Sequence, residues 1–330
     1  MNPCFKFLFP LLCVFTISSC SNDLEVLADY KESAAIYGLL DPNMSIHFIK
    51  INKVFTNVNA KASDVAKIAD SLYFDTIAPE LVENGTGRRI PLYKANILLK
   101  DSGTFASAPN YLYVTKERIY SNQTYRFELR LPNTGTLVTA ETNMVNTPFF
   151  QLPVNFGQRV FSVQPVGTIP VSFQSPQKGK IFDAFFYFNY IEVDKADTNI
   201  KTLKTIEWKI LRSYRTLTDK GGEFVLQRIP GILFYDLLLN SIPKNDNVIR
   251  RFTECELALI SGNLELDTYI QASVPSIGIV QKQSDYSNVT NGIGLFGSRN
   301  TLYLNQITIS DITKIILTTD DKYLPMGFVR

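Results

Sequence analysis

Histidine is almost absent from this chain, because a single residue in 330, His47, carries an imidazole. A Ser-His-Asp or Cys-His catalytic device would have to use it, yet His47 stands between Ile46 and Phe48 in a strand-like segment with no paired motif. A tetrahedral zinc site needs several His or Cys ligands, and the sequence after Cys20 offers His47 and Cys255. We therefore predict a protein that is not an enzyme and that has neither a metal site nor a cofactor.

An excess of one charge sign is lacking too, since 33 Lys and Arg residues stand against 31 Asp and Glu residues. A nucleic-acid-binding protein shows a clustered basic stripe, whereas the Arg-Arg pairs at 88–89 and 250–251 are isolated, and we expect both on the solvated surface. The sequence contains no EF-hand calcium loop. Binding of a cation by a loop stays possible, and the residues at 320–321 and 244–247 are the best candidates for its oxygen ligands. We predict no nucleic-acid partner.

Long apolar runs are missing apart from one at the N-terminus. Lys6 is the only charge before residue 23, and a mostly apolar run follows at 7–17. That run is too short for a bilayer, which needs about 20 apolar residues. Ile-Ser-Ser-Cys at 17–20 then resembles the bacterial lipobox, a signal after which the Cys thiol is acylated and the chain is cut before it.

We therefore predict a signal peptide at 1–19, a lipid on Cys20 and a short tether through residue 26. The lipid would hold the mature chain at a membrane, because each buried CH₂ contributes about 0.8 kcal/mol. The alternatives are an ordinary secretory signal that contains a Cys, or a buried N-terminal helix. Cys255 would be the one cysteine left in the body, and we interpret it as a small buried hydrophobe rather than a nucleophile.

Alternation with a period of two dominates the rest of the sequence. At 124–131, apolar and polar residues alternate in the pattern of a half-buried strand. We predict a mainly β chain, with an immunoglobulin-like or transthyretin-like sandwich at 27–147 and a β-rich α+β domain with short helices at 148–330.

Four short helices are expected, and three of them lie in the C-terminal half. Ser63 is the expected cap of the first, and the second is an apolar stretch at 232–239. The third is capped by Asn263, and the fourth by Ser310. We expect the last helix to turn its three isoleucines inward, namely Ile312, Ile315 and Ile316.

The run at 181–193 is aromatic on both of its alternating faces. Phe182, Phe186 and Phe188 share one face, and Phe185 and Tyr187 lie on the other. We interpret the run as a central strand buried on both sides. A sugar-stacking platform is the alternative, and it needs aromatic side chains on one face alone.

A glycine-rich segment late in the chain matches the bare dinucleotide pattern at Gly292, Gly294 and Gly297. That fingerprint has meaning between a strand and a helix, and here residues 301–309 alternate like a strand. We interpret the glycines as turn and close-packing positions. A recognition loop formed by Asn291, Gly292, Gly294 and Gly297 is the alternative.

Several stretches resemble a large family of uncharacterised Bacteroidetes lipoproteins. They are Tyr-Gly-Leu-Leu-Asp-Pro at 37–42, the segments at 47–55 and 70–74, and the Asn/Gly-rich segment at 287–297. Many members are encoded near TonB-dependent outer-membrane receptors. The resemblance implies an outer-membrane location, with the periplasmic or extracellular face undetermined, and binding rather than catalysis.

The leading hypothesis is a lipid-anchored outer-membrane protein that binds a ligand or partner and serves as an accessory to a TonB-dependent receptor. The first alternative is a structural, adhesion or assembly lipoprotein of the envelope. The second is a hydrolase with paired carboxylates, which would face one another within roughly 5–10 Å across a groove.

Overall fold

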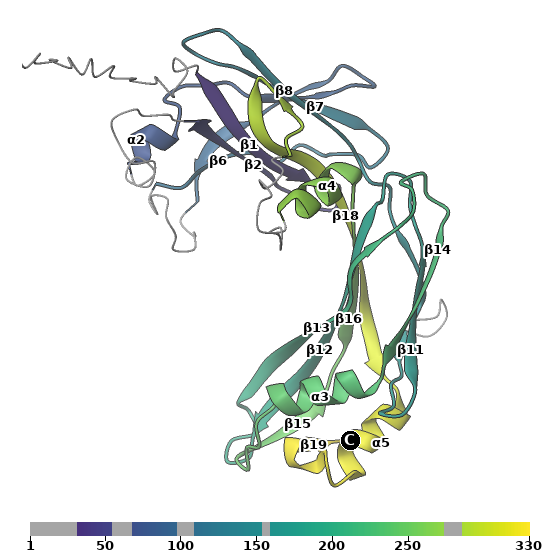
Figure 1. Cartoon of the computed structure of the whole chain (residues 1–330). Helices are drawn as coiled ribbons and strands as arrows, with labels where there is room; N and C mark the ends of the chain where they lie inside the picture. The colour runs from purple at the N-terminus through teal and green to yellow at the C-terminus, as the bar shows by residue number, and fades with distance from the viewer. Residues whose placement is uncertain (1–31, 55–67, 98–108, 154–158, 274–285) are drawn as a thin grey trace, which may run out of the picture. The chain divides into compact units, whose positions relative to one another are not determined.

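The computed structural model describes residues 32–54, 68–97, 109–153, 159–273 and 286–330 (Figure 1). The predicted signal peptide, Cys20 and the tether lie outside these ranges, as does Ser63. The chain is mainly β with several sheets, which confirms the fold class predicted from the sequence. Within the described residues, no helix combines the length and the apolar composition that crossing a membrane requires.

The strands form three sheets. The largest has eleven strands: β19 (Phe328–Val329), β15 (Val248–Phe252), β12 (Ile181–Asp194), β16 (Cys255–Gly262), β18 (Gly292–Ile309), β1 (Ser33–Leu40), β2 (His47–Val54), β6 (Tyr111–Thr115) and β5 (Tyr93–Asn96), with β13 (Lys201–Arg215) beside β12 and β10 (Val160–Phe161) beside β18. The second has β17 (Val289–Thr290), β8 (Leu137–Asn143), β7 (Thr124–Arg130), β3 (Glu80–Glu83) and β4 (Arg89–Pro91). The third has β14 (Phe224–Pro230), β11 (Thr168–Gln174) and β9 (Phe149–Leu152).

The helices are short. They are α2 (Ala69–Leu72), α3 (Ile232–Ser241), α4 (Leu264–Ser273), α5 (Asp311–Thr319) and the 3₁₀ turn η1 (Leu324–Met326). Two predicted caps are confirmed, since Asn263 Oδ1 accepts a hydrogen bond from the Leu266 N–H at 3.1 Å and Ser310 Oγ accepts one from the Thr313 N–H at 3.2 Å. Each cap satisfies a backbone donor that has no partner inside its helix.

One hydrophobic core lies between the five-stranded sheet and strands β1 and β2. The alternation predicted for β7 is confirmed, because Tyr125, Phe127 and Leu129 are buried while their neighbours are not. These side chains share a core with Ile36 of β1 and with Phe296 of β18. Burying side chains of this size contributes about 1.5–3 kcal/mol each, so two sheets with one apolar face each form a sandwich.

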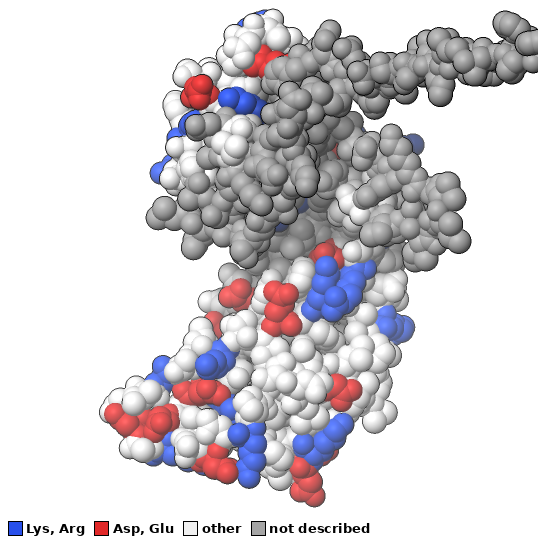
Figure 2. Space-filling model, turned by 60° about the vertical axis from the view of Figure 1, so that its left-hand side comes forward, with Lys and Arg blue, Asp and Glu red and all other residues white. Residues whose placement is uncertain are grey.

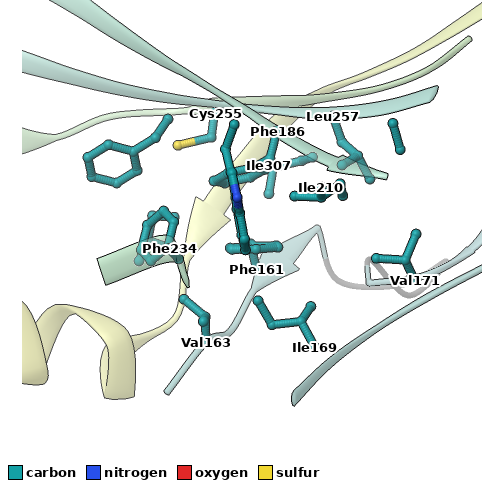
Figure 3. Packing of buried hydrophobic residues seen from close by; sticks show 14 of the residues in the cluster. Phe161, Val163, Ile169, Val171, Phe186, Ile210, Phe234, Cys255, Leu257 and Ile307 are labelled. Atoms are coloured by element: carbon teal, nitrogen blue, oxygen red, sulfur yellow. The ribbon is translucent and has the colours of Figure 1, made fainter. Parts of the chain in front are cut away.

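A second core packs against one face of β12, β13, β16 and the C-terminal end of β18. The rings of Phe161 and Phe186 stack with centroids 3.9 Å apart, and the ring of Phe234 on α3 meets both edge-on. Figure 3 shows Cys255 and Leu257 reaching from the sheet toward this cluster. Helix α3 therefore serves as the layer that covers the inner face of the sheet.

Strand β18 belongs to both cores. Its first part pairs in parallel with β1, from Gly292 opposite Ala34 to Ser298 opposite Leu40, and its later part pairs antiparallel with β16. Strand β17 adds to β8 in the sandwich. Segments from both sides of residue 147 thus share sheets, and the division into two domains at that point stays a prediction.

Candidate functional site

The aromatic strand β12 is buried on one face and partly open on the other. Phe182, Phe186 and Phe188 are 0% exposed, whereas Phe185 and Tyr187 are partly exposed. The prediction that both faces are buried is therefore wrong. Helix α3 and its neighbours cover the inner face. Helix α4 contacts the outer face at the Ile181 end of the strand, whereas Phe185 and Tyr187, farther along, stay partly exposed. Aromatic side chains are therefore accessible on one face of the strand. A sugar-stacking platform, the alternative interpretation, needs this arrangement.

Aromatic side chains from two strands meet on this outer face. The rings of Phe185 and Tyr187 are nearly parallel, with centroids 6.2 Å apart and an interplanar angle of 12°. Phe185 is paired across the strands with Ala258, and Ala258 with Tyr303, which is 53% exposed. Ala258 is 1% exposed, so its small side chain forms the floor between two rings. We call Phe185, Tyr187 and Tyr303 the aromatic face.

Two carboxylates flank the aromatic face. Glu207 on β13 and Glu256 on β16 are both paired with Tyr187, one on each side. Burial, and then the charges of Glu207, Tyr303 and Glu256, raise the pKa of the Tyr187 phenol above its usual value. At neutral pH the site therefore offers a phenolic hydrogen-bond donor between two carboxylates that can only accept.

The cation that contacts Phe185 is held in an ion pair. Lys209 Nζ lies 2.5 Å from Asp183 Oδ2 and 5.1 Å from the centroid of the Phe185 ring. The ion pair and the cation–π contact restrain both side chains, which orders Phe185 before any ligand arrives. The unpaired charges next to Tyr187 are thus negative.

The two carboxylates lie on the strands that flank β12. Glu207 and Glu256 are both paired with Tyr187 and so share its sheet face. At the usual spacing of about 4.8 Å between neighbouring strands, their backbones are about 10 Å apart. A hydrolase with paired carboxylates stays a prediction.

The prediction that both arginines at 250–251 lie on the surface is wrong for Arg250, which is 1% exposed. Its Nε and Nη2 both donate to Glu192 Oε1, at 2.9 and 2.8 Å, and its Nη1 donates to the Met326 carbonyl at 2.6 Å. The pair lies at the floor of a cleft of about 530 Å³ between β12, β13 and the end of α3. Arg251, the next residue, is exposed.

The predicted recognition residues do not form a loop. Gly292, Gly294 and Gly297 lie inside β18, and Asn291, with a φ of 58°, makes the turn that precedes it. Asn291 Nδ2 donates to the Leu137 carbonyl at 2.9 Å. These positions border the sandwich core and are not part of the aromatic face. A recognition role for them stays a prediction.

Gly294 shows why glycine is needed in β18. Its φ is 122°, and a Cβ at this position would lie 2.0 Å from the Ile36 carbonyl oxygen on β1. A Cβ on Gly292 would lie 2.6 Å from the Ala34 carbonyl oxygen. The glycines therefore allow two backbones to pair closely, which agrees with the close-packing interpretation.

His47 is a buried strand residue, as predicted. It is 2% exposed, and its Nε2 has no hydrogen-bond partner in the described part of the chain. Burial lowers the pKa of the imidazole below its usual 6.5, and the charge of Asp41 opposes that shift. Cys255 is buried as well, and burial raises the pKa of its thiol to about 12, as expected of an inert packing residue.

The lowered pKa of His47 should make the free energy of unfolding depend on pH. The folded pKa lies below the unfolded value, so the stabilisation is present above pH 6.5 and is lost as the pH falls through the folded pKa. Because the chain has one histidine, its Cε1–H proton gives one NMR titration curve, and we expect the midpoint below 6.5. A midpoint at or above 6.5 would contradict the burial argument, and His47→Gln serves as the assignment control.

Among the described residues, no three His, Cys, Asp or Glu side chains are grouped to hold a metal ion. Figure 2 shows Lys and Arg interspersed with Asp and Glu over the face in view, with uncharged surface between them. Neither sign forms a continuous stripe on that face.

No protein-family model and no curated protein matches the sequence. Among solved structures, the chain is similar to the C-terminal globular domain of an oligosaccharyltransferase from Pyrococcus abyssi, with 12% sequence identity and a TM-score of 0.24. The match covers 68% of this chain and 47% of the other, so this chain spans about half of that structure's length. A likeness of this size supports no argument about fold or function, and the lipoprotein family stays a prediction.

Proposed function

We propose that this chain is a binding protein of the cell envelope, and that its aromatic face binds a saccharide chain. The observation that carries the proposal is the pair of nearly parallel rings, Phe185 and Tyr187, on the open side of β12. The C–H face of a sugar ring stacks on an aromatic ring, while the hydroxyl groups at its rim need hydrogen-bond partners. Glu207 and Glu256 flank Tyr187 and can accept those bonds.

The charges of the site favour an uncharged saccharide. Glu207 and Glu256 stand on either side of Tyr187, and Lys209 is held by Asp183. An anionic chain would meet two like charges, which disfavours its binding. Charge complementarity therefore argues for a neutral glycan rather than for a polyanion such as a nucleic acid.

The spacing of the rings favours a chain over a single sugar. Tyr303 lies two strands away from Phe185, which is about 10 Å at the usual strand spacing. A monosaccharide stacked on Phe185 does not reach Tyr303. We therefore expect affinity to rise with the number of sugar units until both rings are covered.

Binding to neutral polysaccharides tests the proposal. The full chain is run through native gels that contain soluble neutral glucan, xylan or mannan, and the retardation gives the affinity. We expect at least one to retard the chain, and Tyr187→Ala or Tyr303→Ala to weaken that affinity about tenfold each, since an aromatic contact contributes about 0.5–1.5 kcal/mol beyond its buried area.

Tyr93→Ala is the matched control, because Tyr93 is 65% exposed on β5 and does not belong to the aromatic face. Its affinity should equal that of the wild type. Equal affinities for Tyr187→Ala and the wild type would overturn the assignment of the face. Failure of all three glycans would overturn the neutral-saccharide proposal for these classes.

The envelope location rests on the N-terminal signal, in which the predicted lipid on Cys20 holds the chain at the outer membrane. Cys20→Ala should shift the chain from the membrane fraction to the soluble fraction. A TonB-dependent receptor is the partner that the family resemblance suggests. A mild-detergent pull-down that recovers this chain alone would move the weight to the structural or adhesion alternative.

A further inference from the structure

A second cleft lies beside β15, on the opposite side from the Arg250 pair. It has a volume of about 610 Å³ and is formed by β15, β19 and α5. Its lining residues are of two kinds, cationic and apolar, together with one carboxylate: Arg251, Lys314, Arg330, Phe252, Ile315, Val329 and Asp311. This volume is in the range of small-molecule sites in proteins.

The apolar part of the lining comes from Phe252 on β15, Val329 on β19 and Ile315 on α5. Ile312 is 51% exposed and Ile315 is 41% exposed, so the prediction that they pack inward is wrong. The prediction is confirmed for Ile316, which is partly buried against the core. Thr313 and Leu317 occupy the buried side of α5. Ile315 and Val329 are both partly exposed beside cationic side chains, so the cleft offers apolar as well as charged contacts.

The cationic part of the lining is available for a ligand. Arg251 is paired with Val329 across β15 and β19. Among the described residues, neither Arg251 nor Arg330 forms an ion pair within 4.0 Å. Lys314 lies 3.6 Å from Asp311, which is 94% exposed and therefore screened by water. Three cationic side chains thus face one carboxylate side chain.

We propose that this cleft binds a monomeric long-chain carboxylate, of the chemical class of a fatty acid. The carboxylate would pair with Arg251, whose planar fork matches two oxygens. The alkyl chain would lie along Ile315 and Val329, which a purely ionic ligand would leave exposed. The proposal rests on this cleft alone and is independent of saccharide binding by the aromatic face.

Binding of laurate by isothermal titration calorimetry tests the proposal. The full chain carries Cys20→Ala, so that no lipid of its own competes, and laurate is used below its micelle concentration. We expect saturable binding, weakened roughly tenfold or more by Arg251→Ala because a hydrogen bond to a charged group is lost. Ile315→Ser should weaken binding through the alkyl chain.

Arg212→Ala is the matched control for the loss of one exposed cation, because Arg212 lies on β13 and outside the cleft. Dodecanol has the chain without the charge, and inorganic phosphate has charge without the chain. Both should bind at least tenfold more weakly than laurate.

Three results would overturn the proposal. Equal affinities for laurate and dodecanol would show that the cations take no part. Phosphate binding as tight as laurate binding would show a simple anion site. Binding to phosphatidylglycerol vesicles with none to monomeric laurate would show contact with a membrane surface instead. An intact far-ultraviolet spectrum and an unchanged unfolding midpoint confirm that each variant is folded.

Discussion

Arg250→Ala is expected to lower the free energy of unfolding by about 3–5 kcal/mol, because it removes one partner of a buried ion pair. Arg250 is 1% exposed, while the side chain of Glu192 keeps 18% of its exposure. Without the guanidinium, the Glu192 side chain loses its ion-pair partner, and the Met326 carbonyl loses its donor at 2.6 Å.

The loss would extend to the C-terminal segment. The Arg250 backbone N–H donates to the Gly327 carbonyl, and β15 pairs with β19 through Arg250 and Phe328. The side chain of Arg250 thus fastens η1 and β19 to the sheet at a point where the ladder has two pairs of residues. Its removal should free this segment first and then lower the stability of the core around Phe328.

Urea unfolding followed by tryptophan fluorescence measures the effect, since the single Trp208 lies in the same core. Arg251→Ala is the matched control, because it removes the same side chain from the next residue of the strand, where it is exposed. We expect a change within about 0.5 kcal/mol for the control. Similar values for the two variants would show that the Arg250–Glu192 pair adds nothing to stability.

Arg250 also shows what the sequence does not contain. Two consecutive arginines look alike in a sequence, and both were expected on the surface. Consecutive residues of a strand point to opposite faces. One face of β15 is covered, so Arg250 is buried there while Arg251 on the other face stays exposed. The residues around Arg250 in the sequence are apolar, namely Val248, Ile249 and Phe252. Such neighbours predict a buried strand. They do not identify the ion-pair partner, Glu192, which lies on another strand.

Helix α5 is a similar case. Its cap at Ser310 was predictable from a local rule, and so was the cap of α4 at Asn263. The inward face was predicted only in part. Ile316 packs against the core as expected, but Thr313 takes a fully buried position that the sequence pattern did not indicate. The Thr313 hydroxyl group bonds both the N–H and the carbonyl of Val163, at 2.9 and 2.8 Å. A hydroxyl group satisfied in this way can be buried, and its partner, Val163, is about 150 residues away in the sequence.

The outer face of β12 could be predicted in part. Alternation separated Phe185 and Tyr187 from Phe182, Phe186 and Phe188, and that division is confirmed. The sequence could not tell whether a second layer covers the first pair. Tyr303 on β18 lies on the same face because Ala258 on β16 is paired with both Phe185 and Tyr303. The register between distant strands cannot be predicted from the local sequence pattern. The need for glycine in β18 could not be predicted for the same reason, since it arises from the close pairing with the distant strand β1.

Adjacent residues of β12 should give opposite results in stability and binding. Phe186→Ala is expected to lower the free energy of unfolding by about 3–5 kcal/mol, the usual cost of a cavity left by a buried phenylalanine. Phe186 is 0% exposed and stacks on Phe161. Phe185→Ala removes the same atoms from the open face, where the expected cost is about 1 kcal/mol.

Saccharide affinity should follow the other order. Phe185→Ala removes a ring of the aromatic face and should weaken binding about tenfold, by the same reasoning as for Tyr187. Phe186→Ala, measured where the chain is still folded, should bind as the wild type does. Each variant is thus the control for the other, since the two substitutions delete identical atoms from neighbouring positions.

The comparison separates the two interpretations of the aromatic run. If the run served the core alone, Phe185→Ala would change stability modestly and leave saccharide binding intact. If the outer face is a binding surface, binding falls while the unfolding midpoint barely moves. A loss of stability of about 3 kcal/mol in Phe185→Ala would instead show that something covers the outer face, and the face could not then bind a ligand.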